Sequence, residues 1–155
     1  MKRQFYLNVI LLIVVWLGPA CSPRLISPPD PTAMPTAASS SRIEDQASLI
    51  ETLHASGSEV ELGDPVVQAF FSVTGQILKV NDMDVQVFEY ESAEAMEADA
   101  AQVAPDGGSI GTNMVMWVEP PHFFKSGRVL VLYVGEDQGV IDLLRDALGE
   151  QFAGR

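Results

Sequence analysis

Apolar positions at helical and alternating spacing predict the elements of the C-terminal part of the chain. The first is a helix over 43–55, begun by the capping-box spacing of Ser41 and Glu44 and ended by Gly57. Short apolar and β-branched runs then predict strands at 66–73, 76–80 and 84–90, and 59–62 is a further short strand candidate. Asn81 and Asp82 separate the last two runs, so these two strands are expected to form a hairpin.

The second half of the pattern begins with an alanine-rich helix over 93–104, which Ser92 can cap and the following Pro-Asp-Gly-Gly ends. Strands are predicted at 114–118 and 128–134, separated by the break Glu119-Pro120-Pro121. A last helix follows Asp137 and runs to 148. The order of elements is therefore α-β-β-β-α-β-β-α.

This order predicts an α+β fold. Successive hairpins favour a mainly antiparallel sheet of about five strands, and three amphipathic helices lying on it would make a two-layer sandwich. The run 129–134 is almost continuously apolar, as expected of a strand covered on both sides, and 84–90 carries apolar side chains on both faces.

The N-terminus has the three-part layout of a secretory signal over residues 1–20. Lys2 and Arg3 precede an apolar stretch of 13 residues, Phe5 to Leu17, and Gly18-Pro19-Ala20 leads to Cys21. These residues resemble a bacterial lipoprotein signal, which implies that Cys21 becomes the lipidated first residue. That family usually has Leu three residues before the Cys, where this chain has Gly18. Cleavage after Ala20 without lipidation and an uncleaved membrane anchor are the two alternatives.

Residues 21–41 are predicted to form a flexible stalk behind the lipidated Cys21. Five of the ten prolines of the chain lie between Ser22 and Ser41, among Ser, Thr and Ala residues. Proline fixes φ and removes an amide donor, so this segment cannot form a packed element. We expect one globular domain over 42–155, held outside the cytoplasm on the cell membrane, or on the outer membrane if the host has two.

Charge and cysteine content limit the function classes. Without Lys2 and Arg3, seven Lys and Arg residues face 21 Asp and Glu, a net charge of −14. Such a field repels nucleic acid, so no nucleic acid partner is expected. Cys21 is the only cysteine, so the domain has no internal disulfide and must rely on its core.

Candidate chemistry is sparse, and no metal or cofactor is expected. Asp82 and Asp84 have a spacing that could ligate a cation, but turn chemistry also explains them. His122, Phe123 and Phe124 follow a double proline, and we expect them to form an exposed interaction patch.

Three stretches of the chain, FFSVTGQILKVNDMDVQVFEY, SIGTNMVMWVEPPHFF and VLVLYVG with LLRDALGEQFAG, resemble a family of small uncharacterised bacterial lipoprotein-like exported proteins. The resemblance covers about 43–155 and implies an exported α+β domain, with no activity to carry over. The leading hypothesis is a non-enzymatic binding module with an envelope protein or a small ligand as partner. The alternatives are an enzyme that uses His122 with Glu119 or Asp106, and a carrier of small apolar ligands. Trp117, Phe123, Phe124 and Tyr133 could line an apolar groove, but core packing also explains Trp117 and Tyr133.

Overall fold

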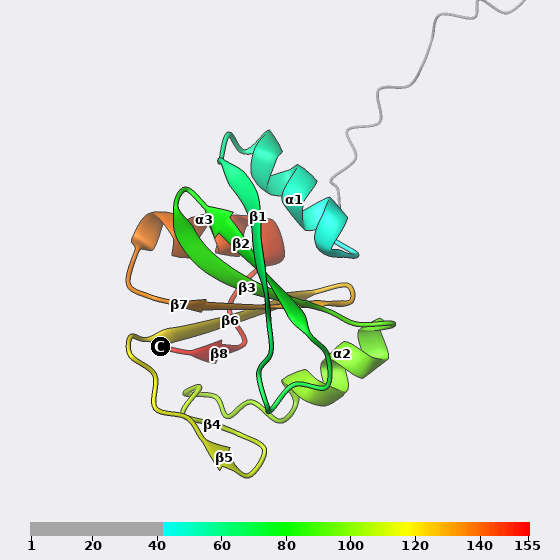
Figure 1. Ribbon diagram of the computed structural model, residues 1–155, viewed down its shortest axis with the longest axis vertical. Helices are drawn as coiled ribbons and strands as arrows, with labels where there is room; N and C mark the ends of the chain where they lie inside the picture. Colours follow the sequence, from blue (N-terminus) through cyan, green and yellow to red (C-terminus); the bar gives the residue numbers. More distant parts are fainter. Residues whose placement is uncertain (1–41) are drawn as a thin grey trace, which may run out of the picture. The chain divides into compact units, whose positions relative to one another are not determined.

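The computed structural model describes residues 42–155, which belong to one compact unit (Figure 1). The predicted signal peptide over 1–20, the predicted lipidation site Cys21 and the predicted stalk over 21–41 lie outside the described residues. Within the described part of the chain, no helix is long and apolar enough to cross a membrane.

Three helices and eight strands make up the domain. In chain order they are α1 (Gln46–Ala55), β1 (Val60–Val66), β2 (Gly75–Val80), β3 (Met83–Glu89), α2 (Ala93–Ala100), β4 (Ser109–Ile110), β5 (Asn113–Met114), β6 (Pro121–Ser126), β7 (Val129–Val134), α3 (Gln138–Leu148) and β8 (Ala153–Gly154).

Six of the strands form one antiparallel sheet in the order β1-β2-β3-β7-β6-β8, and β4 and β5 form a separate small hairpin. The α+β class, the mainly antiparallel sheet and the three helices predicted from the sequence are confirmed. The main sheet has six strands where about five were expected: the 114–118 run and the 66–73 run, apart from Val66, do not join it, whereas β1, β6 and β8 do.

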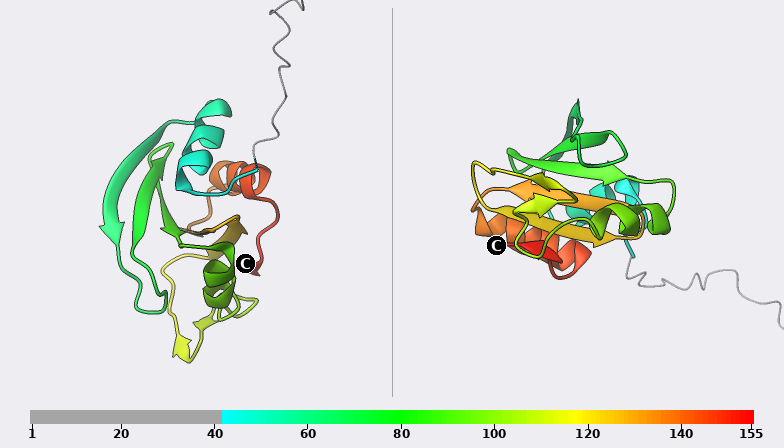
Figure 2. Two further views of the ribbon diagram at one scale, coloured as in Figure 1. Left: turned by 90° about the vertical axis from the view of Figure 1, so that its right-hand side faces the viewer. Right: turned by 90° about the horizontal axis from the view of Figure 1, so that it is seen from below.

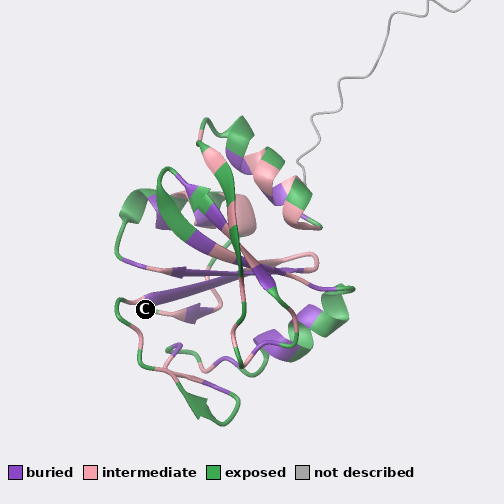
Figure 3. Ribbon diagram, in the orientation of Figure 1, coloured by how far each residue is buried: buried purple, intermediate pink, exposed green. Residues whose placement is uncertain are grey.

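The main sheet is covered on both faces, as the two further views show (Figure 2). α1 and α3 pack on one face against Val85, Val87 and their neighbours. α2 packs on part of the other face, against Phe88 of β3 and against Tyr90, which directly follows β3. β3 and β7 lie in the middle of the sheet, and nearly all of β7 is buried (Figure 3). The expected two-sided burial of 129–134 is therefore confirmed.

Two element boundaries differ from the sequence prediction for local reasons. α1 begins after Asp45, not after Ser41, because Asp45 and Ser48 form the capping box: the Ser48 N–H donates to Asp45 Oδ1 at 2.9 Å. β1 runs through Asp64 and Pro65 to Val66, beyond the end at Leu62 that the sequence suggested. It can do so because it is an edge strand with a bulge between Leu62 and Pro65.

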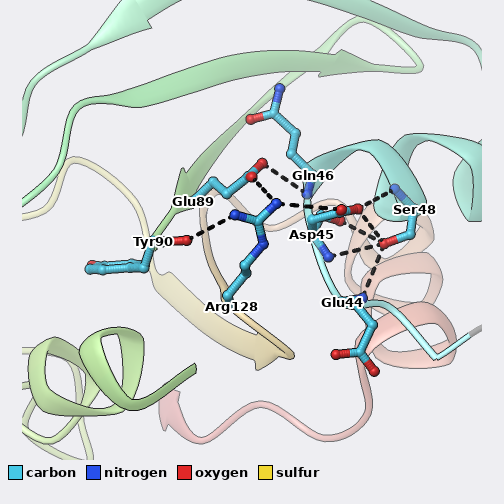
Figure 4. Close-up of polar contacts among 7 residues, drawn as sticks. All are labelled: Glu44, Asp45, Gln46, Ser48, Glu89, Tyr90 and Arg128. Carbon is cyan, nitrogen blue, oxygen red and sulfur yellow. Dashed lines mark hydrogen bonds and ion pairs between the residues drawn. The ribbon is translucent and has the colours of Figure 1, made fainter. Parts of the chain in front are cut away.

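Arg128 joins the start of β7 to the N-terminus of α1 (Figure 4). Its guanidinium lies 2.6 Å from Glu89 Oε1 and 3.5 Å from Asp45 Oδ2. Glu89 Oε2 also accepts a hydrogen bond from the Gln46 N–H at 3.1 Å. The N–H and hydroxyl of Ser48, and then Arg128, lower the pKa of Asp45 from its ordinary value. This cluster fixes α1 at the point where the chain enters the domain.

Asp99 is a buried carboxylate on α2 that the sequence reasoning did not single out. Its Oδ2 accepts from the Ser72 N–H at 2.7 Å, the Ser72 hydroxyl at 2.8 Å and the Tyr90 hydroxyl at 3.0 Å. Its Oδ1 accepts from Gln102 Nε2 at 3.1 Å. Asp99 therefore ties the irregular segment 67–74 and the end of β3 to α2.

Candidate functional site

His122, Phe123 and Phe124 lie in β6, and the exposed patch predicted there is not found. The Phe123 and Phe124 side chains are fully buried, because β6 is paired on both sides and covered on both faces. Alternation along the strand also separates the two rings: Phe123 belongs to the core under α2 and Phe124 to the core under α1 and α3. The break at the double proline ends at Pro120, because Pro121 already occupies the first position of β6 and His122 to Phe124 follow within the strand.

The contacts of His122 indicate a structural role. Its side chain is only 6% exposed and its ring stacks on Tyr133. Nδ1 lies 2.8 Å from Gln151 Oε1, and Nε2 lies 3.1 Å from the Gly135 carbonyl oxygen. Both ring nitrogens therefore have partners, and neither partner is a carboxylate. The enzymatic hypothesis requires a carboxylate that accepts a hydrogen bond from this ring, directly or through one water.

Asp106, Trp117 and Glu119 are brought together by the fold. The sequence had suggested Asp106 and Glu119 as partners of His122, and Trp117 as the lining of an apolar groove. All three line an open groove of about 420 Å³ between the segment that follows α2, the extended chain before β6, and Arg155. We call it the 106–121 groove; its walls are Asp106, Gly108, Val115, Met116, Trp117, Val118, Glu119, Pro120, Pro121 and Arg155. The carrier hypothesis calls for an enclosed pocket between sheet and helices, whereas this groove lies along an extended segment of the chain.

Trp117 anchors one side of this groove. Its indole N–H donates to the Gly107 carbonyl oxygen at 2.7 Å, and its ring meets Phe123 and Phe70 edge-on, with centroids 6.0 and 6.2 Å away. Gly107 has a φ of +69°, and a Cβ placed there would lie 2.8 Å from Pro121 Cγ. A side chain at this position would therefore collide with Pro121, so glycine is required at the residue whose carbonyl oxygen accepts from the indole.

The most exposed apolar side chains form a stripe beside Trp117. Met114, Met116 and Val118 are 90%, 97% and 94% exposed, while Val115 and Trp117 between them are half-buried against the core. Exposure thus alternates with a period of two, as in an extended chain with one face in water. The sequence predicted a strand at 114–118, but only Asn113–Met114 is paired as β5, and its outer face has no cover.

The backbone of this stretch, which we call the 114–118 segment, has a free edge. The Val115 N–H donates to the Gly108 carbonyl oxygen at 3.1 Å, so residue 115 faces β4. In an extended chain the next backbone groups point the other way, so those of Met114 and Met116 face away from β4. Among residues 42–155, no backbone hydrogen bond is made by the N–H or carbonyl groups of 116–119.

No group of three or more His, Cys, Asp and Glu side chains in the described part of the chain could hold a metal ion. In particular, Asn81 and Asp82 have positive φ values of 49° and 68°, as the central residues of a tight hairpin turn between β2 and β3 do. Turn chemistry therefore accounts for this acidic stretch.

Comparisons with known proteins give no match: no family model fits the chain, and no curated protein or solved structure is significantly similar to it. The resemblance to lipoprotein-like exported proteins therefore remains a prediction. Function has to be argued from the groove and the exposed stripe.

Proposed function

We propose that this protein is a membrane-tethered, extracytoplasmic binding module, without enzymatic activity, that holds an envelope partner at the 106–121 groove. The observation that carries this proposal is the stripe of Met114, Met116 and Val118, three almost fully exposed apolar side chains in a row. Single exposed apolar residues are ordinary, but a contiguous apolar surface beside a groove is typical of an interaction site. A half-buried tryptophan next to it adds the kind of side chain that dominates binding energy.

The position of the stripe suits a tethered protein. The described chain begins at Arg42 beside α1, and the β4–β5 hairpin lies at the opposite end of the domain (Figures 1 and 2). A chain attached to the membrane through Cys21 would therefore join the domain at one end and leave the other end accessible to a partner. The net charge of −14 on residues 21–155 favours solubility of the domain and repels anionic lipid headgroups.

Site-specific photo-crosslinking in host envelopes tests the binding site. A photoreactive residue in place of Met116 should give a discrete crosslinked product. The same residue in place of Leu62, a 67% exposed apolar position on β1, should not. Equal labelling from both positions, or none from Met116, would contradict the proposed site.

The tether is tested separately by the intact mass of the protein from host membranes. Wild type should carry an acyl-sized increment at Cys21, and Cys21→Ala should lack it and be released to the medium. An unmodified wild type that begins at Cys21 would show a free secreted domain. This result would contradict attachment to the membrane, but it would not bear on binding at the 106–121 groove.

A further inference from the structure

We infer that the 114–118 segment binds an extended, basic peptide of its partner as an added β-strand. This inference rests on the proposed function and specifies the chemistry of the occupant. A peptide that adds to a strand edge gains affinity from main-chain hydrogen bonds, and its alternate side chains supply the specificity. The 114–118 segment offers both a free backbone edge and exposed side chains at alternate positions.

The first part is the free backbone edge. Because Val115 is bonded to Gly108, the N–H and carbonyl groups of Met114 and Met116 face outward from the β4–β5 hairpin. An incoming strand can pair with these groups and so widen the small hairpin to three strands. A two-stranded hairpin by itself is only marginally stable in water, so the added strand would also stabilise the hairpin.

The contrast with β1 shows that this edge is unusual for the domain. β1 is the outer strand of the main sheet, and it carries acidic Glu61 and Asp64, Pro65, and a bulge between Leu62 and Pro65. Charges, proline and bulges on an edge strand prevent pairing with other chains. The 114–118 segment, Met-Val-Met-Trp-Val, contains neither a charged residue nor a proline.

The second part is the apolar stripe. Met114, Met116 and Val118 lie at alternate positions, so they can meet every second side chain of a paired strand. Methionine is flexible and adapts to side chains of different shape, which suits a surface that must accept a peptide. The groove next to the stripe, with Trp117 on its wall, can receive an apolar side chain of the same peptide.

The negative charge of the domain favours a basic peptide over the other possible occupants of this site. Residues 42–155 carry 20 acidic and six basic side chains, and Asp106 and Glu119 stand at the groove with Arg155 as the only basic residue on its walls. A second copy of this chain and an anionic membrane would both meet this field with charge of the same sign. A peptide with Lys or Arg between its apolar residues is attracted to the same field.

The test uses the full chain and a synthetic peptide of alternating lysine and valine, with binding followed by fluorescence anisotropy. We expect saturable binding that weakens as salt is added, because screening reduces the attraction. The Met114→Ser/Met116→Ser variant should bind at least about tenfold more weakly, since it loses the apolar contacts of two side chains. Leu62→Ser, the matched control on the protected edge, should bind like wild type.

Three further probes separate the modes of binding. A peptide N-methylated at alternate residues should lose binding if the backbone edge is used, and a glutamate–valine peptide should not bind. Equal binding of the methylated peptide, or of the acidic one, overturns the inference. So does dimerisation of the protein, or its sedimentation with anionic vesicles, if either is abolished by Met114→Ser/Met116→Ser.

The outcomes also separate this inference from the proposed function. If crosslinking at Met116 captures an envelope partner but the lysine–valine peptide does not bind, the binding module stands and strand addition is wrong. If the peptide binds as expected and Met116 crosslinks nothing in envelopes, the surface has the inferred chemistry and the proposed envelope partner is wrong.

Discussion

The buried carboxylate of Asp99 provides a stringent test of the fold, because one substitution removes the acceptor for several donors. Asp99 is 7% exposed and accepts from Tyr90, Ser72 and Gln102. Asp99→Ala should therefore detach the segment 67–74 from α2. The loss of unfolding free energy differs from donor to donor, because water can replace the lost hydrogen bond only where the donor is exposed.

The Tyr90 side chain is buried, so its hydroxyl would be left without a partner, at a cost of about 1–3 kcal/mol. The hydrogen bonds from Ser72 to the charged acceptor add about 1.5–3 kcal/mol in total, because Ser72 is exposed and water replaces part of them. Gln102 is also exposed and adds little. Removing the charge ends its desolvation cost and offsets part of the sum. We expect a net loss of about 3 kcal/mol, a large fraction of the roughly 5–15 kcal/mol of a typical domain.

Urea denaturation followed by circular dichroism measures this loss, with a fall in Tm of roughly 10 °C expected in parallel. Asp99→Asn keeps one oxygen acceptor and should lose about half as much. Glu97→Ala on the same helix removes an exposed pair with Lys125 and should cost less than about 1 kcal/mol. If Asp99→Ala costs no more than Glu97→Ala, the Asp99 network does not hold the domain together as described.

Three further predictions concern other parts of the domain. Burial and then the Asp99 carboxylate raise the pKa of Tyr90 above its ordinary 10.0, so the folded state keeps a proton that the unfolded chain releases. Stability is then complete below pH of about 10 and falls as the pH rises further; Tyr90→Phe should abolish this fall in alkaline urea titrations. Gly127→Ala should cost at least about 2 kcal/mol by thermal unfolding, because φ is +54° and its Cβ would lie 2.5 Å from Glu44 Cα; a neutral result would contradict this turn geometry. Arg128→Ala should cost only about 1 kcal/mol, since the ion pair with Glu89 is more than a third exposed on the arginine side, and the cost should shrink in high salt; a loss independent of salt would contradict an electrostatic origin.

Local signals in the sequence predicted most of the main sheet. Asn81 and Asp82 correctly predicted the β2–β3 turn, and the apolar run 129–134 correctly predicted a strand covered on both faces. The same reasoning was wrong for Phe123 and Phe124, which it placed on the surface. A double proline argues for a break when the strand is considered alone, but it is tolerated where the strand begins.

The candidate site was only partly predictable. Asp106 and Glu119 were noticed as possible partners of His122, and Trp117 as a possible lining residue, but their common groove depends on how the chain passes from α2 to β6. Met114 and Met116 were predicted only as part of a strand over 114–118, with no face assigned to water. An alternating pattern predicts that one face is buried, but it does not say which of two apolar faces that is.

The sequence by itself determined the properties that depend on residue type and on neighbours close in the chain. These are the signal-like N-terminus with Cys21, the proline-rich segment 21–41, the acidic charge, the helices and the hairpin turns. Only the tertiary structure decided which faces are covered: it buried His122 and Phe123–Phe124 and left Met114, Met116 and Val118 in water. The physical reason is that burial depends on the strands and helices that come to lie against a residue, and these are distant in the chain.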